Sequence, residues 1–503
     1  MAINVNKTIN KKIIIFAICF VAVLVFIFIR TYPQLMKHPS ARQEIKLEAP
    51  NIVFINIDSL RADHMGVYGY NKNTTPFLDS LFKKGVIFKN AIAPAPFTFQ
   101  DDAAIFSGIY PSQNNITDWV KIINKKIDLL PKILSYYGYN TAAFVSPSLY
   151  ESFEMNKSFD DYIMNPEKNI DEVKFSLSNK LKQTESPFFV FWHIYDVHLP
   201  YYSASEEFYP KEYKGSLLPI SKYFAKQNEL MMPTQKLWSN QTKDGLCDNF
   251  SNSLLTCERY VKITPEDKEY IIASYDTGVK YVDKQLYYFF DSIKNEPFFE
   301  NTLFIISAEH GEDLGDHKLF FHGDIYNVNI HVPLVFIHPK LKPLEIKGAV
   351  STVDIMPTIF SLMGIPKNEK AEGEDLSPLF NGENYKERPI FSERAPFNEY
   401  SAIMGNWKYI MRDPLKLDPE EYNNKITPFM LTVLKSDCKE SVKDELYDLS
   451  NDPYEQNNLI GKGYEQEEEL ANLVRGFKEK MIRFREMQEV NQSLPLQSII
   501  QYP

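Results

Sequence analysis

The sequence predicts an α/β fold in which helices sandwich a mainly parallel sheet, with one N-terminal transmembrane helix and a smaller C-terminal α+β subdomain. Three observations predict it. Short apolar runs alternate with segments of helical spacing, a pattern typical of parallel sheets that are covered on both faces. Three of these runs end in acidic or histidine residues, namely Asp58, His193, and Glu309 followed by His310. One long uncharged apolar run precedes all of them, at residues 13–29.

The composition limits the class of protein. The chain has 503 residues, of which 44% are hydrophobic and 24% are charged, as in globular proteins and unlike disordered or collagen-like chains. A net charge of -11 provides no general basic field for a polyanion, so we expect no nucleic-acid partner. Four cysteines are too few for a disulfide scaffold, and no CxxC pair indicates a structural zinc site.

The apolar run 13–29 (IIIFAICFVAVLVFIFI) predicts a membrane anchor within residues 1–32. At ~1.5 Å per residue, a helix of this length just crosses a ~30 Å hydrocarbon core. Positive charge is denser before the run than after it, which predicts a cytoplasmic N-terminus and an extracytoplasmic main domain. A cleaved signal peptide is the alternative, although the RTYP that follows has no small-residue cleavage pattern. We therefore expect a single-pass membrane protein.

Residues 33–50 are polar and Pro-punctuated, which indicates a linker before a main domain at 51–388. Runs of β-formers predict strands at 51–57, 141–145, 188–192 and 302–307. Helical spacing predicts helices at 75–84, 128–137 and 264–293, the last of which opens with the capping sequence TPED. Residues 200–260 turn polar and irregular, and we interpret them as an insertion that rims a pocket.

The C-terminal part, 389–503, has short strand-like pieces at 407–410 and 445–449 and a long charged helix near 464–487. These elements predict the α+β subdomain. In an oxidising compartment, Cys247 and Cys257 either form a disulfide that closes a small loop or remain two thiols. The sequence does not decide between these two alternatives.

Asp58, Glu309 and His310 supply two carboxylates and an imidazole at strand ends. Such a ligand set holds a divalent cation, and the imidazole favours zinc or manganese over calcium. A cation there would activate a hydroxyl nucleophile and offset the charge of an oxyanion ester. The alternative is that these residues are ordinary capped and solvated groups at the ends of strands.

Several segments, in this order and spacing, resemble the sulfatase family of the alkaline phosphatase superfamily. The resemblance extends from residue 51 to about 459 and implies the corresponding fold. The segments that carry it are DSLRADHMGVYGY with TTPFLDSL, SGIYPSQNN, HGEDLGDH with HGDIYNVNIHVPL, VDIMPTIFSLMGIP, and ELYDLSNDPYEQNNL.

The resemblance implies one divalent metal ion (zinc, manganese or calcium) and assigns its ligands. Asp58 matches the first metal carboxylate, and Glu309 with His310 matches the second ligand pair. At the position of Glu309 the family usually has Asp. The longer Glu side chain shifts the ion or weakens its binding. Ser59 occupies the place of a second aspartate found in many sulfatases, which suggests fewer calcium-type ligands.

The resemblance also implies that Thr98 is the nucleophile and a further metal ligand. Sulfatases have C/S-x-P-x-R here, with the first residue oxidised to formylglycine, whereas this chain has Thr98-Phe99-Gln100-Asp101-Asp102. We therefore expect no formylglycine. Threonine here resembles the phosphate-handling branch, in which Thr98 attacks phosphorus and forms a phospho-enzyme. The alternative role for Thr98 is a helix N-cap.

Two extra carboxylates beside an anionic ester, Asp101 and Asp102, are unexpected. They would repel the ester unless they bind a cation or point away from it. They alternatively favour the helix N-terminus through its dipole, or select a substrate with a positive group.

The remaining site residues are mostly histidines. By resemblance, His198 contacts the ester or protonates the leaving group, and His322 grips the transferred group. His193 and Lys408 are further candidates for substrate contact, with a solvated strand lysine as the alternative for Lys408. His317 and His331 are either extra ligands or ordinary surface or packed histidines, and Arg61 supports the loop.

These residues together predict a membrane-anchored, metal-dependent hydrolase of phosphate, or alternatively sulfate, esters. The ester belongs to a small molecule, a glycan or a lipid head group. One alternative is a phosphoethanolamine or phosphoglycerol transferase, although a single membrane span favours a hydrolase. Another is a homologue that binds a glycan or a lipid head group without turnover, which Asp101, Asp102 and Glu309 would explain.

Overall fold

The structure is a computed structural model, and its elements lie in the second of the two units into which the chain divides, residues 1–45 and 46–503. It describes residues 45–117, 121–146, 149–164, 170–198, 264–317, 320–413 and 443–493, together with residues 201, 208 and 213.

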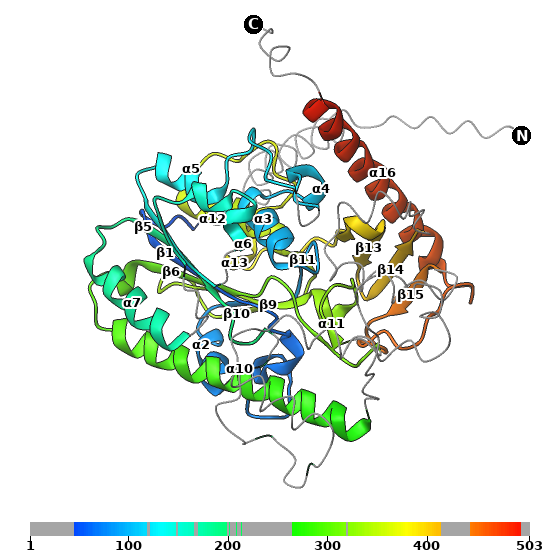
Figure 1. The fold of residues 1–503 in the computed structure, drawn as a ribbon, viewed down its shortest axis with the longest axis horizontal. Coiled ribbons are helices and arrows are strands. Elements are labelled where there is room, and N and C mark those ends of the chain that lie inside the picture. Colours follow the sequence, from blue (N-terminus) through cyan, green and yellow to red (C-terminus); the bar gives the residue numbers. More distant parts are fainter. Residues whose placement is uncertain are drawn as a thin grey trace, which may run out of the picture. The chain divides into compact units, whose positions relative to one another are not determined.

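A nine-stranded sheet forms the centre of the main domain, in the order β10-β2-β9-β6-β1-β5-β3-β4 with β11 paired to β2 (Figure 1). All pairs are parallel except those of β9, which is antiparallel to both β2 and β6. The prediction of a mainly parallel sheet is therefore confirmed, with one reversed strand. The strands are β1 Asn51–Ile57, β2 Val86–Ile92, β3 Asn140–Val145, β4 Asp161–Met164, β5 Phe188–Ile194, β6 Thr302–Ser307, β9 His331–Ile337, β10 Leu344–Ile346 and β11 Val350–Ser351.

Helices cover both faces of this sheet, with α2, α7 and α10 on one side and α3, α5 and α12 on the other (Figure 1). β1, β5 and β6 lie in the middle of the sheet and are buried along their whole length, as their unbroken apolar runs require. The helices are α2 Pro76–Phe82, α3 Thr98–Ser107, α4 Pro111–Asn114, α5 Leu130–Tyr136, α6 Leu149–Ser152, α7 Ile170–Gln183, α10 Pro265–Ile293, α11 Asn327–Ile330, α12 Ile355–Met363 and α13 Ser377–Phe380.

The long helix α10 begins where the sequence predicts. The Thr264 hydroxyl accepts from the Asp267 backbone N–H at 3.2 Å, and the Asp267 carboxylate accepts in return from the Thr264 N–H at 2.8 Å. This reciprocal capping box satisfies two backbone donors that the first turn leaves without partners. The capping sequence TPED therefore fixes the start of the helix.

The C-terminal subdomain is a four-stranded antiparallel sheet in the order β12-β13-β14-β15, packed against the long helix α16 (Figure 1). Its elements are β12 Ile390–Arg394, β13 Glu399–Met404, β14 Trp407–Arg412, β15 Glu445–Asp448 and α16 Glu465–Ser493. Apolar side chains of α16 at helical spacing fill the interface, namely Leu470, Val474, Phe477 and Met481.

The subdomain is also bonded to the segment that precedes α3. The Glu393 backbone N–H donates to Pro94 O at 2.8 Å, and the Ser392 hydroxyl donates to Ala93 O at 2.7 Å. The buried Glu393 carboxylate accepts from both the backbone N–H and the hydroxyl of Ser112, beyond the end of α3. The second sheet therefore holds both ends of α3 in place.

A largely buried ionic cluster around Arg412 joins the subdomain to the main domain. The guanidinium contacts Asp324 at 3.0 Å, Glu399 at 2.8 Å and Glu445 at 2.7 Å. Replacing Arg412 by methionine leaves three carboxylates without their common cation, so we expect a loss of about 3–5 kcal/mol of unfolding free energy. Chemical denaturation measures this loss. The same change at the exposed Arg483 of α16 is expected to cost less than about 0.5 kcal/mol, and equal costs would contradict a role for the cluster.

None of the helices that the structure describes is long and apolar enough to cross a membrane. The predicted anchor at 13–29 lies outside the described residues, as do Cys247, Cys257 and nearly all of the insertion at 200–260. The anchor, the disulfide and the insertion therefore stay predictions.

Candidate active site

Three adjacent strands bring the predicted site residues to one edge of the sheet. β1 lies between β5 and β6, and Asn56 near its end is in register with His193 on one side and Ser307 on the other. Asp58 follows β1 directly, and Glu309 follows β6 after one intervening residue. Because all three strands are parallel, their carboxyl ends place these side chains together.

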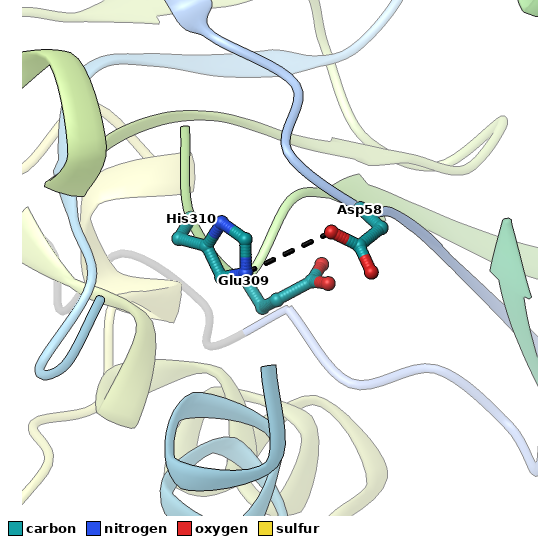
Figure 2. A group of neighbouring side chains, drawn as sticks. All are labelled: Asp58, Glu309 and His310. Atoms are coloured by element: carbon teal, nitrogen blue, oxygen red, sulfur yellow. Dashed lines mark ion pairs between the residues drawn. The ribbon is translucent and has the colours of Figure 1, made fainter. Parts of the chain in front are cut away.

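Asp58, Glu309 and His310 form a buried cluster in which one ligand atom from each lies within 4.8 Å of the others. Figure 2 shows the His310 ring facing the Asp58 carboxylate, with Nε2 and Oδ1 separated by 3.7 Å, and the Glu309 carboxylate lying beside them. All three side chains have no exposed surface. Two carboxylates and one imidazole are suitable ligands for zinc or manganese.

The electrostatics of this cluster favour a bound cation. Among the described residues, Asp58 Oδ2 and Glu309 Oε2 are buried without a hydrogen-bond partner. Burial, and next the charge of Glu309, raises the pKa of Asp58 well above its usual range. Burial and the charge of Asp102 do the same to the pKa of Glu309. Because a buried carboxylate oxygen without a hydrogen-bond partner is costly, a divalent cation between these two carboxylates fits the site.

Thr98 lies against the cluster at the start of α3. Its hydroxyl Oγ1 is 3.1 Å from His310 Nε2, and His310 Nδ1 is 2.8 Å from Gly311 O. Because a carbonyl only accepts, Nδ1 carries the proton, and the Nε2 lone pair faces Thr98. The alternative N-cap role is wrong, since Phe97 occupies the cap position and Thr98 is the first helical residue.

His322 and His198 extend the cluster away from the sheet. The His322 ring centroid lies 3.9 Å from that of His310 and 5.1 Å from that of His198. Burial lowers the pKa of His322 to about 3, so this imidazole is neutral. His198 is half-buried and stacks on Tyr195 at 4.2 Å. The two histidines that the sequence assigns to the ester are therefore adjacent, and one of them reaches solvent.

Asp101 and Asp102 are fully buried and bonded within the protein. Asp101 Oδ1 accepts from the Thr352 hydroxyl at 2.9 Å. Asp102 Oδ1 accepts from Asn56 Nδ2 at 2.7 Å, and its Oδ2 accepts from the Tyr150 hydroxyl. The structure therefore shows an arrangement that the sequence analysis did not name, in which both carboxylates accept hydrogen bonds from neutral groups of the protein.

Comparison with known proteins agrees with this arrangement. A family model described as Sulfatase matches residues 50–365, and one described as N-sulphoglucosamine sulphohydrolase, C-terminal, matches residues 315–487. The first alone spans more than half of the chain.

The chain belongs to the sulfatase family.

Named relatives within this family are distant but extend over most of the chain. A Delta 4,5-hexuronate-2-O-sulfatase of Bacteroides thetaiotaomicron is 24% identical in an alignment of 440 residues, and the match covers 82% of this chain and 85% of the relative. Arylsulfatase K of Bos taurus is 23% identical, over 82% of this chain and 79% of the relative. In structure, the phosphonate monoester hydrolase of Agrobacterium radiobacter is similar with a TM-score of 0.61 at 17% identity, covering 87% of this chain and 96% of that one.

In this sulfatase-family chain, His193 lies behind the metal cluster. Its Nδ1 donates to Ser146 O at 2.7 Å, and its Nε2 lies 3.1 Å from Glu309 Oε1 and 3.5 Å from Asp58 Oδ2. The side chain is fully buried. This placement differs from the predicted substrate contact, because both ring nitrogens are already engaged with protein groups. His193 instead orients the carboxylate of Glu309.

Replacing His193 by alanine is expected to weaken metal binding by about 10–100-fold, since groups that orient ligands typically contribute this much. Isothermal titration of the metal-free protein with zinc or manganese measures the change. His331 is a suitable control, because it is a half-buried histidine of the sheet whose Nε2 lies 2.9 Å from the Lys89 carbonyl and outside the metal cluster. Unchanged affinity in the His193 variant, or an equal loss in the control, would contradict this role.

Lys408 is not brought to the cluster. Its side chain is fully buried, with Nζ 2.6 Å from Glu455 Oε1 and 3.1 Å from Asn327 Oδ1. The alternative of a solvated strand lysine is wrong for the same reason. The described contacts of Lys408 join β14 to the segment that begins α11, so its predicted contact with substrate has no support in the geometry.

Arg61 supports the loop after β1, as expected, through contacts with Asp63 at 2.8 Å, Asp316 at 2.6 Å and the Glu312 carbonyl at 3.0 Å. His317 stacks on Tyr326 with ring centroids 3.7 Å apart. Like His331, it is outside the candidate metal group found among the described residues. The packed alternative therefore describes both histidines.

Sequence reasoning missed Glu312. Its carboxylate is fully buried, lies 3.5 Å from His322 Nδ1, and contributes to raising the pKa of Asp58. Burial raises its own pKa well above the usual range. The signal was available in the motif HGEDLGDH, where Glu312 stands two residues after His310.

Proposed function

We propose that this protein is a metal-dependent hydrolase of phosphate esters in which Thr98 is the nucleophile. One observation carries the proposal: the Thr98 hydroxyl stands at the N-terminus of a helix, 3.1 Å from His310 Nε2, against a buried carboxylate pair. A hydroxyl beside a cation-binding cluster is the arrangement that nucleophilic catalysis on oxyanion esters needs.

The side chains divide the chemistry between them. Asp58, Glu309 and His310 would hold the cation, with Thr98 as a further ligand. When bound, the cation would polarise an ester oxygen and lower the pKa of a coordinated hydroxyl. The N-terminus of α3 stabilises negative charge that develops at Thr98 Oγ1 and on the ester. The neutral His322 contacts the transferred group, and the half-buried His198 delivers a proton to the leaving group.

The choice of phosphate rests on the nucleophile. Threonine cannot give formylglycine, because its oxidation would yield a ketone and not an aldehyde. A threonine alkoxide attacks phosphorus and forms a Thr98 O–P bond while the ester P–O bond breaks and the protonated alcohol leaves. Water then attacks phosphorus from the opposite side, breaks the Thr98 O–P bond, and so releases phosphate and restores the hydroxyl. The two relatives found by sequence and named above are sulfatases, so sulfate esters are the competing substrates. The ester belongs to a small molecule, a glycan or a lipid head group.

The test uses the full chain in detergent, loaded separately with zinc, manganese and calcium. p-Nitrophenyl phosphate, bis-p-nitrophenyl phosphate and p-nitrophenyl sulfate are supplied to it and to the Thr98→Ala variant. Phosphate-ester turnover that the variant lacks supports the proposal. Sulfate turnover alone would overturn the choice of ester. Tight metal binding without turnover of any of the three would favour a transferase, and an absence of both would favour a non-catalytic binding protein.

We also propose that residues 13–29 anchor the protein, with the active site outside the cytoplasm. The length of the run and the denser positive charge before it support this orientation. In sealed membrane vesicles that expose the cytoplasmic face, protease should leave the main domain intact until detergent opens the vesicles. Digestion without detergent would contradict the orientation, and release by carbonate would contradict the anchor.

A further inference from the structure

Asp102 stands one helical turn after Thr98 on α3. Residues four apart lie on the same side of a helix, so the carboxylate and the nucleophile belong to one face of α3. Both side chains are buried, Asp102 completely. Whatever holds Asp102 therefore also fixes the rotation of the first turn of α3, where Thr98 stands.

Asp102 is bonded to two other elements of the fold. Asn56 donates to its Oδ1 at 2.7 Å, and Asn56 lies in β1 only two residues before Asp58. Tyr150 of α6 donates its hydroxyl to Oδ2. The first of these bonds ties the helix that carries the nucleophile to the strand that carries the metal carboxylate.

The neighbouring carboxylate has a different environment. Asp101 accepts from the Thr352 hydroxyl, in the short helical turn Thr352–Asp354 that precedes α12. Neither this turn nor α12 carries a residue of the metal cluster. Of these two consecutive carboxylates of α3, Asp102 is bonded to the strand of Asp58, whereas Asp101 is bonded to the turn before α12.

A buried carboxylate that accepts only from neutral groups carries a desolvation cost. Burial is the main cause that raises the pKa of Asp102 to about 6, while the neighbouring His193 and the bonds from Tyr150 and Asn56 oppose it. Two apolar side chains would fill the same space without that cost. The hydrogen bonds of Asp102 are directional, however, whereas apolar contacts are not, so the hydrogen bonds define the orientation of α3 more closely.

We propose that Asp102 is a positioning residue, which sets the place of Thr98 relative to Asp58 by fastening α3 to β1. This inference rests on the proposed nucleophilic role of Thr98. It explains why an acidic residue is tolerated at a place where an arginine would be expected: the carboxylate faces Asn56 and Tyr150, and its hydrogen bonds, not its charge, are what the site uses.

The test compares Asp102→Ala with Asp102→Asn in the full-length holoenzyme. Alanine removes both bonds, and a displaced nucleophile should lower kcat by about 10–100-fold with KM within about 2-fold. Asparagine keeps the oxygen that accepts from Asn56, and the Tyr150 hydroxyl can turn to accept from its amide. Asp102→Asn should therefore retain kcat within about 5-fold of the unmodified protein.

A readout that does not depend on turnover separates this inference from the proposed function. In the cobalt-substituted protein, the visible absorption of the ion reports whether Thr98 remains a ligand. The Asp102→Ala spectrum should move toward that of Thr98→Val, while Asp102→Asn should match the unmodified protein. This result is expected even if none of the tested esters is a substrate.

Asp101→Asn is the matched control, because asparagine still accepts from Thr352, and its kcat and spectrum should be unchanged. Circular dichroism confirms folding, and if Asp102→Ala does not fold, Asn56→Ala removes the same bond from the other side. An Asp102→Ala or Asn56→Ala protein with unaltered kcat and spectrum would overturn the proposal. So would an Asp102→Asn protein as impaired as Asp102→Ala, since that result would assign the role to charge.

Discussion

Replacing Thr98 by valine is expected to lower ester turnover by at least about 10³-fold while leaving the fold intact. Valine has nearly the same shape as threonine and fills the same buried place at the start of α3, so it removes the hydroxyl and little else. His310 Nε2, 3.1 Å from that hydroxyl, would lose its contact with the nucleophile. Steady-state rates with the best phosphate ester measure the loss.

Serine at the same position is the matched control, because it restores a hydroxyl to the same backbone position. Thr98→Ser should recover turnover to within about 10–100-fold of the unmodified protein, since serine has more rotamers than β-branched threonine and holds Oγ less firmly. Turnover of Thr98→Val close to that of the unmodified protein would contradict the nucleophilic role and leave water as the attacking group.

Replacing Asp58 by asparagine is expected to abolish the stabilisation that a cation gives to the protein. A cation present at about 100 times its dissociation constant adds roughly 2.7 kcal/mol to the unfolding free energy of the unmodified protein. Asparagine removes a buried carboxylate whose pKa is raised by burial and next by the charge of Glu309. The variant should therefore be more stable than the unmodified protein without metal and gain nothing when metal is added.

Thermal unfolding with and without zinc or manganese measures both effects. Asp375→Asn is a suitable control, because Asp375 is exposed and accepts hydrogen bonds from the backbone and hydroxyl of Ser377, away from the metal cluster. Its melting temperature should respond to metal as that of the unmodified protein does. An Asp58→Asn protein that is still stabilised by metal would show that the cation binds elsewhere.

Local patterns in the sequence predicted the framework of the site. The apolar runs that end at Asp58 and Glu309 are neighbouring strands, and the helix predicted at 264–293 begins at its capping sequence. These features are readable because each depends on residues close together in the chain. The antiparallel direction of β9 was not predicted, since strand direction depends on which distant strands become neighbours.

Two side chains of the predicted site have other roles than the sequence predicted, and the reason is again that these roles depend on distant parts of the chain. Asp102 was expected to repel an anionic ester. It instead accepts hydrogen bonds from Asn56 and Tyr150, which are 46 and 48 residues away in the chain. Lys408 was expected to reach substrate or solvent, but its ammonium group is buried in an ion pair with Glu455. A sequence motif shows which residue types are present and how they are spaced. The partners that decide the role of a buried charge come from remote parts of the chain.

The central claim is that Thr98 forms a covalent bond to the transferred group. The most direct test is to mix the metal-loaded full chain with p-nitrophenyl phosphate, quench with acid within milliseconds to seconds, and analyse the peptides by mass spectrometry. A phosphoryl group on Thr98, absent from the metal-free protein and from Thr98→Val, is the result expected. Turnover of the ester at an unchanged rate by Thr98→Val, with no modified Thr98 at any time in the unmodified protein, would contradict it.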